Sequence, residues 1–350
     1  MSDDSTVLSQ MLATDGPLDT ASVRERFEQL WWRQSDSNAV AALLTPYLAQ
    51  PLSDSEAAWA HMALANALAV GEHAAEAVRA HETFERWLPG KSPRLSRTAP
   101  YYAAPEGSPG ATMGPDEIRL HFLSQSVEFA TAYGAVGRDD DYVAKADLAL
   151  AGLTPTKDNV EVRFYGLRIF MCASQLAGDF DRAERRNLAM HAIADQAEDA
   201  SKAAELHAFA LTSEIQLARG QNDAARVAET RRQALSLLGE LEKSGSSAID
   251  LRGYRHELAH HLTQSRRYDL ALPLLDAVLA TGDHFGGGYG WVMHAAAVWQ
   301  VTSDRPRTLT LLREARDHDG RDLVGEFQGT PGFSDVKDDP EFLRAISRSV

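Results

Sequence analysis

Residues 164–183, FYGLRIFMCASQLAGDFDRA, decide the fold that the sequence predicts. Before Gly178, apolar side chains recur at intervals of three and four, the spacing of one face of a helix. Gly178 interrupts this pattern and indicates a turn into a second helix. The same period runs through WAHMALANALAV (59–70), β-branched residues are sparse, and no segment has the alternation typical of a strand. The sequence therefore predicts an all-α protein.

Short turn segments between two helices recur along the chain, which predicts an internal repeat. From Gly137 onward the steps between successive turns are 41, 42, 46 and 36 residues. The first step, of 66 residues, contains a Pro/Gly-rich insert at 89–115, and its removal leaves roughly 40 residues. The turns are expected at Gly71, Gly137, Gly178, Gly220, Arg266 and about Thr302.

The turn GDFDRA (178–183) resembles the G-D-[YF]-x-x-A turn of the tetratricopeptide repeat (TPR) family. In that family the glycine ends the first helix, the aromatic residue wedges between the two helices, and the small residue allows the second helix to pack closely. Around Arg266 the glycine is lost, but Ala259, Tyr268 and Ala271 hold the small, aromatic and small positions at the family's spacing.

The resemblance is strongest in the third and fifth repeats and weaker in the fourth, where Ala225 holds the small position after Gly220. Steps near 40 residues exceed those of a standard TPR, as in bacterial TPR-like proteins with long repeats. Atypical terminal segments are expected, because the ends of a repeat array need a polar outer face. The resemblance implies a TPR-like α-solenoid with an N-terminal helical cap (1–55), about six helical hairpins (56–317, with the insert 89–115) and a C-terminal capping segment (318–350).

Composition limits the possible functions. The chain of 350 residues is 44% hydrophobic, which is ample for a continuous core, and its formal net charge is -15. That charge argues against nucleic-acid binding and favours partners with basic groups. Cys172 is the only cysteine, so an internal disulfide is excluded, which fits a reducing compartment. The first residues lack the features of a secretory signal and no apolar run approaches a membrane helix, so we expect a cytoplasmic protein.

The string RHELAHHL (255–262) contains H-E-x-x-H, a pattern of zinc peptidases. On a helix, His256 and His260 would lie one turn apart beside Glu257, and a catalytic zinc would need a third protein ligand. Candidates for that ligand are Asp276, Asp283 and His284. However, the string falls inside the first helix of the fifth repeat, and no strand is expected that could bind a substrate. The preferred interpretation therefore contains no metal or cofactor.

In TPR proteins the first helix of each hairpin lines a concave face, where its second, fifth, ninth, twelfth and thirteenth positions meet ligands. We counted back from Gly178, Gly220 and Arg266 and registered the sixth repeat on Trp291. The resulting set is polar and aromatic, and both histidines of the string are expected to face the groove. Such groups suit a bound peptide, whose backbone must exchange water for side-chain partners. The predicted groove residues are Tyr165, Arg168, Cys172, Gln175, His207, Glu214, His256, His260, Thr263, Gln264, Tyr289 and Trp299.

The sequence thus predicts a non-enzymatic TPR-like scaffold whose concave groove binds a peptide or protein segment. Two alternatives stay open: a ligand-responsive TPR-type regulatory sensor, and a zinc-dependent hydrolase that uses His256, Glu257 and His260. Neither nucleic acid nor a membrane is an expected partner. The insert 89–115 contains basic and aromatic residues, and it is predicted to be either a disordered loop or a part of the binding surface.

Overall fold

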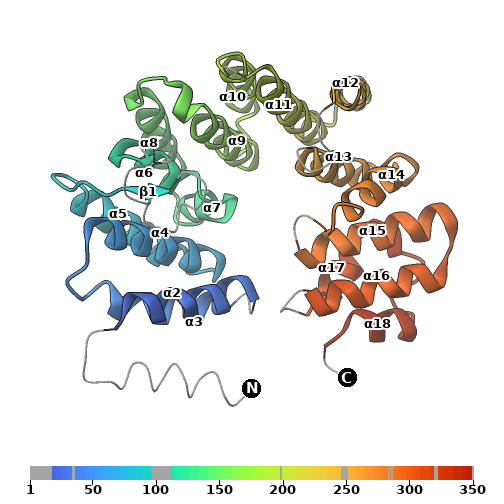
Figure 1. The fold of residues 1–350 in the computed structure, drawn as a ribbon, viewed down its shortest axis with the longest axis horizontal. Coiled ribbons are helices and arrows are strands. Elements are labelled where there is room, and N and C mark those ends of the chain that lie inside the picture. The colour runs from blue at the N-terminus through green and yellow to red at the C-terminus, as the bar shows by residue number, and fades with distance from the viewer. Residues whose placement is uncertain are drawn as a thin grey trace. The chain divides into compact units, whose positions relative to one another are not determined.

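The computed structural model describes residues 18–33, 36–96, 112–197, 199–245, 251–282, 284, 287–318 and 322–348. These residues are overwhelmingly helical, which confirms the all-α prediction (Figure 1). The chain divides into two compact units, Met1–Ala197 (unit 1) and Glu198–Val350 (unit 2). No helix within the described ranges is long and apolar enough to cross a membrane.

Unit 1 begins with a short helical pair, followed by three hairpins and one additional helix, α6. Helix α3 packs on α4, while α6 packs on α8 and α9. In chain order the elements are α2 (Thr20–Glu28), the π-helix η1 (Gln29–Arg33), α3 (Ser37–Tyr47), α4 (Asp54–Val70), α5 (Ala74–Trp87), β1 (Leu95–Ser96), β2 (Thr112–Met113), α6 (Pro115–Leu123), α7 (Val127–Ala135), α8 (Asp139–Gly152), the 3₁₀ helix η3 (Lys157–Asn159), α9 (Val160–Leu176) and α10 (Phe180–Ala194).

The two ends of the predicted insert are ordered, and they supply the only strands of the described chain. Strands β1 and β2 are antiparallel, with Leu95 paired to Met113, and both side chains are buried. The backbone N–H groups of Ser92 and Arg94 donate to side chains at the start of α4, each at 2.9 Å. The expectation of no strand is therefore wrong here, although each of the two strands has only two residues. The centre of the insert, 97–111, lies outside the described residues.

Unit 2 contains three hairpins and a C-terminal segment that packs on the last of them. Helix α18 contacts α16, and both α17 and η4 contact α15. The rings of Phe327, Phe333 and Phe342 form a buried cluster in this segment, with the first two centroids 4.5 Å apart. The elements are α11 (Ala200–Gly220), α12 (Ala224–Lys243), α13 (Arg252–Gln264), α14 (Tyr268–Leu279), α15 (Gly287–Thr302), α16 (Arg305–His318), α17 (Val324–Gly329), the 3₁₀ helix η4 (Pro331–Phe333) and α18 (Pro340–Ile346).

The turn of every hairpin contains one residue in the left-handed backbone region, a common way to end a helix. The hairpins are α4–α5, α7–α8 and α9–α10 in unit 1, and α11–α12, α13–α14 and α15–α16 in unit 2. Their left-handed residues are Glu72, Gly137, Gly178, Asn222, Arg266 and Ser303. Gly71 and Gly220 do not take this role, because the chain turns one and two residues later, respectively. These six residues define the same point in each hairpin, and we call them the turn residues.

Five of the six turns also share one hydrogen bond. The backbone N–H of the residue after the turn residue donates to the carbonyl five positions earlier, which satisfies an acceptor that the helix end would otherwise leave open. In the third hairpin, Asp179 donates to Ser174 at 2.9 Å; in the fifth, Arg267 donates to Leu262 at 2.8 Å. The equivalent bonds are His73 to Leu68, Arg138 to Tyr133 and Asp223 to Ala218. Equivalent positions in different hairpins can therefore be compared directly.

A continuous series of aromatic rings runs through the core of unit 1. Successive centroids are 4.6 Å apart for Phe84 and Phe122, 5.5 Å for Phe122 and Phe129, and 5.4 Å for Tyr133 and Tyr142. The Tyr142 hydroxyl donates to the Leu123 carbonyl at 2.8 Å, which satisfies a buried donor. These rings come from α5, α6, α7 and α8, and they hold the additional helix α6 within the hairpin stack.

Candidate functional site

The predicted groove residues lie on the first helices of four hairpins, α9, α11, α13 and α15. Helix α9 belongs to unit 1 and the others to unit 2, so the set falls into two groups. On α9, Tyr165 is exposed, Arg168 and Gln175 are half-buried, and Cys172 is buried with 8% of its surface exposed. Only part of this helix face is therefore open to a ligand.

In unit 2 the structure brings three predicted residues together. The ring centroids of His260 and Tyr289 are 5.8 Å apart, and Gln264 Nε2 donates to the Tyr289 hydroxyl at 3.3 Å. These side chains belong to α13 and α15, which pack against each other. Thr263 is only 1% exposed and belongs to the core. The fifth and sixth hairpins thus share a polar and aromatic contact at predicted groove positions.

His256 is buried, contrary to the expectation that both histidines of the H-E-x-x-H string face an open groove. Its side chain lies on the packed side of α13, and only 7% of the residue is exposed. Burial lowers the pKa of His256 to about 4, which the charge of Glu257 opposes and His260 reinforces. A neutral, buried imidazole takes part in the packing of α13 and is not an accessible contact.

The predicted groove positions of the fourth hairpin are shifted by two residues. Glu214 accepts a hydrogen bond from Arg226 Nε at 3.0 Å, so its carboxylate faces α12, the second helix of its own hairpin. His207 is half-buried on the same helix. The count that gave both residues started at Gly220, whereas the turn residue is Asn222. The same count started from Asn222 gives Phe209, Thr212, Gln216, Arg219 and Gly220 as the predicted groove positions.

Trp299 contacts the C-terminal segment. Its indole Nε1 lies 3.2 Å from both carboxylate oxygens of Asp335, and its ring lies 5.3 Å from that of Phe342. This side of α15 is therefore occupied by the chain's own C-terminal residues.

The candidate zinc ligands that the structure describes do not belong to a group that could hold a metal ion. Among the described residues, no group of three or more His, Cys, Asp or Glu side chains could hold a metal ion. Two of the proposed third ligands are joined through His294: His284 Nε2 lies 2.9 Å from His294 Nδ1, and His294 Nε2 lies 2.9 Å from Asp276 Oδ1. The third, Asp283, lies outside the described residues.

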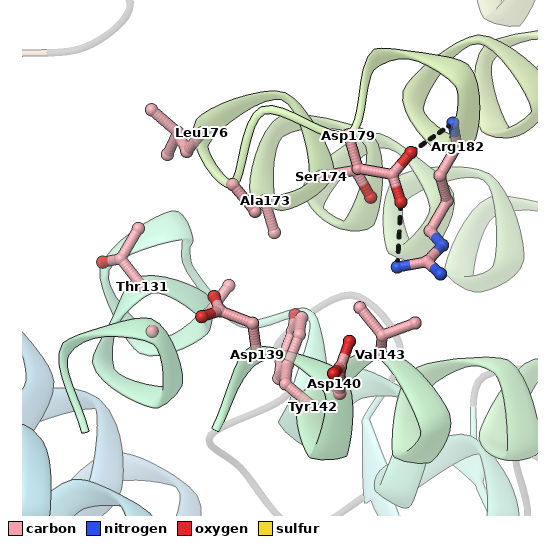
Figure 2. Close-up of a pocket in the computed structure, with 13 residues that line it drawn as sticks. Thr131, Asp139, Asp140, Tyr142, Val143, Ala173, Ser174, Leu176, Asp179 and Arg182 are labelled. Atoms are coloured by element: carbon pink, nitrogen blue, oxygen red, sulfur yellow. Dashed lines mark hydrogen bonds and ion pairs between the residues drawn. The ribbon is translucent and has the colours of Figure 1, made fainter. Parts of the chain in front are cut away.

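Unit 1 contains a cavity of about 450 Å³ between its second and third hairpins. It lies at their turn end, and we call it the acidic cavity. Figure 2 shows Thr131, Asp139 and Asp140 on one side and Ala173, Leu176 and Asp179 on the other. The lining comes from α7, α8, α9, α10 and the turn before α10.

Carboxylates dominate the charged lining of the acidic cavity. Asp139 and Asp140 lie in the first turn of α8, and neither side chain has a hydrogen bond or ion pair with another described residue. Asp179 caps α10 by accepting from the Arg182 backbone N–H at 3.0 Å, and it also pairs with the Arg182 guanidinium at 3.1 Å. The single cation of the lining is therefore already paired. Acidic residues also stabilise a helix N-terminus, but that role does not require a cavity.

An exposed leucine forms the apolar edge of the acidic cavity. Leu176, the last residue of α9, is 64% exposed, and Ala173 and Ala177 lie beside it. Leu176 is the thirteenth position in the register counted from Gly178, which is a predicted groove position, although Leu176 is not among the predicted groove residues. An exposed leucine above carboxylates can bind a side chain that combines an apolar stem with a positive charge.

Hydrogen bonds of the buried Arg186 side chain fix the residues beneath the acidic cavity. Arg186 is buried, and its guanidinium donates to the Phe170 carbonyl at 2.7 Å, to Ser174 Oγ at 2.9 Å and to Asp147 at 2.9 Å. Ser174 and Tyr142 line the cavity and are themselves buried. The polar floor is thus satisfied internally, and of the lining carboxylates only Asp139 and Asp140 lack a partner among the described residues.

A second cavity, of about 540 Å³, lies in unit 2 beside the fourth hairpin, and two arginines contribute to its lining.

No protein-family model matches the chain, and neither the curated proteins nor the solved structures contain a match to it.

Proposed function

We propose that this protein is a non-enzymatic, TPR-like repeat protein that binds a peptide or protein segment. The acidic cavity would receive a lysine or arginine side chain of that segment. The single observation that carries the proposal is the combination of two unpartnered carboxylates with the exposed Leu176 in one cavity between successive hairpins. The shared turn geometry supports the inference that the hairpins are repeats of one unit.

The charge of the chain favours a basic partner. A net charge of -15 attracts cations over the whole surface, and Asp139 and Asp140 concentrate that preference at one point. A lysine or arginine stem could lie along Leu176, while its charged end reaches the carboxylates. Polar first-helix residues near the cavity, such as Gln175, would meet the backbone of the bound segment.

A peptide array tests this function. Purified protein is applied to immobilised random 12-residue peptides, and the enriched sequences are compared with those of an Asp139→Asn/Asp140→Asn variant. Wild type should enrich lysine or arginine next to apolar residues, and the variant should lose that preference because its cavity is no longer charged. Enrichment of acidic peptides, or no enrichment, would contradict the proposal.

The chain offers a matched control for the apolar part of the site. Leu176→Ser removes the exposed leucine at the cavity, whereas Leu188→Ser removes a leucine on α10 that is 68% exposed and lies outside the lining. We expect binding to weaken in the first variant and to persist in the second. Equal losses would show that exposed leucines bind peptides nonspecifically.

A further inference from the structure

The cavity of unit 2 differs in its chemistry from the acidic cavity. Its wall is formed by one face of α12, where Ala224, Val227, Ala228 and Arg231 follow at helical spacing. The end of α11, the turn before α12 and Ser265 complete the lining. The charged residues of this lining are two arginines and one aspartate, and we call this cavity the basic cavity.

The carboxylate in the basic cavity is already engaged. Asp223 is the N-cap of α12, and its side chain accepts a hydrogen bond from the Arg226 backbone N–H at 2.9 Å. Neither Arg219 nor Arg231 pairs with it. The guanidinium groups therefore set the charge that a ligand would meet.

The two arginines are exceptional in this chain. Both are half-buried, and neither side chain makes a hydrogen bond or ion pair with any described residue. Every other arginine in the described ranges that is at least half-buried has a partner, for example Arg226 with Glu214 and Arg305 with Asp339. In a chain with 50 acidic and 35 basic side chains, a carboxylate would be readily available as a partner.

Arg219 bears a desolvation cost that its surroundings offset only in part. Burial lowers the pKa of the Arg219 guanidinium, and the nearby Tyr289 only partly opposes this. The last turn of α11 favours a cation through the helix dipole, but this does not explain Arg231 in the middle of α12. Unpaired, partly desolvated charges are unfavourable for folding, so the two arginines mark this cavity as a candidate binding site.

We infer that the basic cavity is a second binding site, for an oxyanion carried on an apolar body. Guanidinium groups donate paired hydrogen bonds to carboxylate and phosphate oxygens. Ala224, Val227 and Ala228 offer an apolar wall beside them, and a volume of about 540 Å³ exceeds the needs of the anion alone. The ligand class is a small phosphate ester or carboxylic acid. This site is independent of the proposed peptide site, which lies in unit 1.

Calorimetric titration of the full chain tests the inference with three probes: phenyl phosphate, benzoate and inorganic phosphate. Saturable binding of phenyl phosphate, tighter than that of inorganic phosphate, would identify a phosphate ester on an apolar body. Tighter binding of benzoate would identify a carboxylate. Arg219→Gln and Arg231→Gln should each weaken the preferred probe by about tenfold, because each removes a charge-assisted donor. Failure of all three probes to bind would overturn the inference.

Two further variants keep the test decisive. Arg313→Gln removes an exposed arginine of α16 outside the cavity and should leave binding unchanged. Ala228→Glu puts a carboxylate into the cavity at an exposed helix position that tolerates glutamate, and it should abolish binding. The preferred probe should raise the melting temperature of wild type and not that of Ala228→Glu. Equal loss in Arg313→Gln, or full binding in Ala228→Glu, would place the anion elsewhere and overturn the inference.

Discussion

The acidic cavity of unit 1 and the basic cavity of unit 2 occupy equivalent places in their hairpins but carry opposite charges. Each cavity lies between two successive hairpins, and positions can be counted from the turn residue of the earlier hairpin, Gly137 or Asn222. In both cavities the lining includes the residue three positions before that turn residue and the residues two, five and six positions after it. Both also include the position just before the next hairpin's turn residue. From acidic to basic cavity, the pairs are Gly134 and Arg219, Asp139 and Ala224, Tyr142 and Val227, Val143 and Ala228, and Ala177 and Ser265.

This correspondence underlies our proposal that the two cavities bind different ligands, because equivalent positions of two hairpins carry different charges. The turn fixes where successive hairpins separate, and a cavity forms there in both units. Exchanging Gly134 for Arg219 and Asp139 for Ala224 then changes its charge. Each cavity also contains one side chain of the opposite charge, and that side chain already has a partner. In the acidic cavity Arg182 pairs with Asp179, and in the basic cavity Asp223 accepts a hydrogen bond from a backbone N–H. Charge selection therefore depends on the unpartnered side chains alone.

The largest expected difference between the two cavities is in how much one wall residue contributes to stability. The residues compared are Tyr142 and Val227, each five positions after its turn residue. Tyr142 is buried against Tyr133 and Phe170, and Tyr142→Ala should lower the free energy of unfolding by about 3–5 kcal/mol. Val227 is half-buried, so Val227→Ala should cost less than about 1 kcal/mol. Urea unfolding measures both values. Similar losses would mean that the two cavity walls are equally part of the core.

The second prediction concerns pH, and it applies to both units. Burial lowers the pKa of His61 in unit 1 and of His256 in unit 2 to about 4, from an ordinary 6.5. Between pH 6.5 and pH 4 the unfolded histidine binds a proton that the folded one does not. The free energy of unfolding is therefore highest above pH 6.5, and it falls as the pH drops toward 4. Each histidine should contribute up to about 1.4 kcal/mol per pH unit in that window.

Urea unfolding at pH 7.0 and pH 5.5 checks this prediction. His61→Leu should reduce the pH dependence, because leucine cannot titrate and the site packs against Phe84 and Trp87. His73→Leu is the control, since His73 lies at the exposed turn of the same hairpin. An unchanged slope in His61→Leu would show that this histidine is not held neutral by burial.

The third prediction separates the ligands of the two cavities. Asp139→Asn/Asp140→Asn should weaken basic peptides by about tenfold and should leave phenyl phosphate binding unchanged, because the substitutions lie outside the basic cavity. The loss should be smaller at high salt, where exposed charges are screened. Parallel titrations of one preparation with a basic peptide and with phenyl phosphate give both values. Weakened binding of both ligands in this variant would show that the two cavities are not independent sites.

The smallest expected effect comes from Gly134, three residues before the turn residue. A Cβ at this position would lie 2.7 Å from Asp139 Oδ1, so Gly134→Ala must displace that carboxylate. Alanine favours the helix by up to about 1 kcal/mol, so stability should rise slightly while basic-peptide binding weakens a few-fold. Gly239→Ala, in a helix position with open space, is the control for the helix effect. Increased stability with unchanged binding would exclude Asp139 from the contact.

The sequence predicts the hairpins well because their signals are local. Helical periodicity and the turn around Gly178 are readable in a few residues, and the helices lie where that pattern places them. The turn residues Glu72 and Asn222 were missed because non-glycine residues there adopt the left-handed conformation, and this displaced the predicted groove positions of the fourth hairpin. His256 was misjudged because the repeat register, counted from Arg266, places a residue on a helix face but does not show how closely neighbouring side chains cover it.

The two cavities were not predictable from the chain alone. Asp139 and Arg219 are ordinary charged residues at helix ends, and their significance comes from what successive hairpins place beside them. Repeat register could have identified Leu176, because it occupies a groove position. The absence of partners for Arg219 and Arg231 depends on every neighbouring side chain, and that information exists only in three dimensions.

The most direct test of opposite charge selection is a crystal structure determined after soaking with benzylamine and phenyl phosphate together. Our account predicts the ammonium group about 2.7–3.2 Å from Asp139 or Asp140 and the phosphate at a similar distance from Arg219 or Arg231. The phenyl groups should lie along Leu176 and Val227, respectively. Both probes in one cavity, the reverse arrangement, or two empty cavities at saturating concentrations would contradict the account.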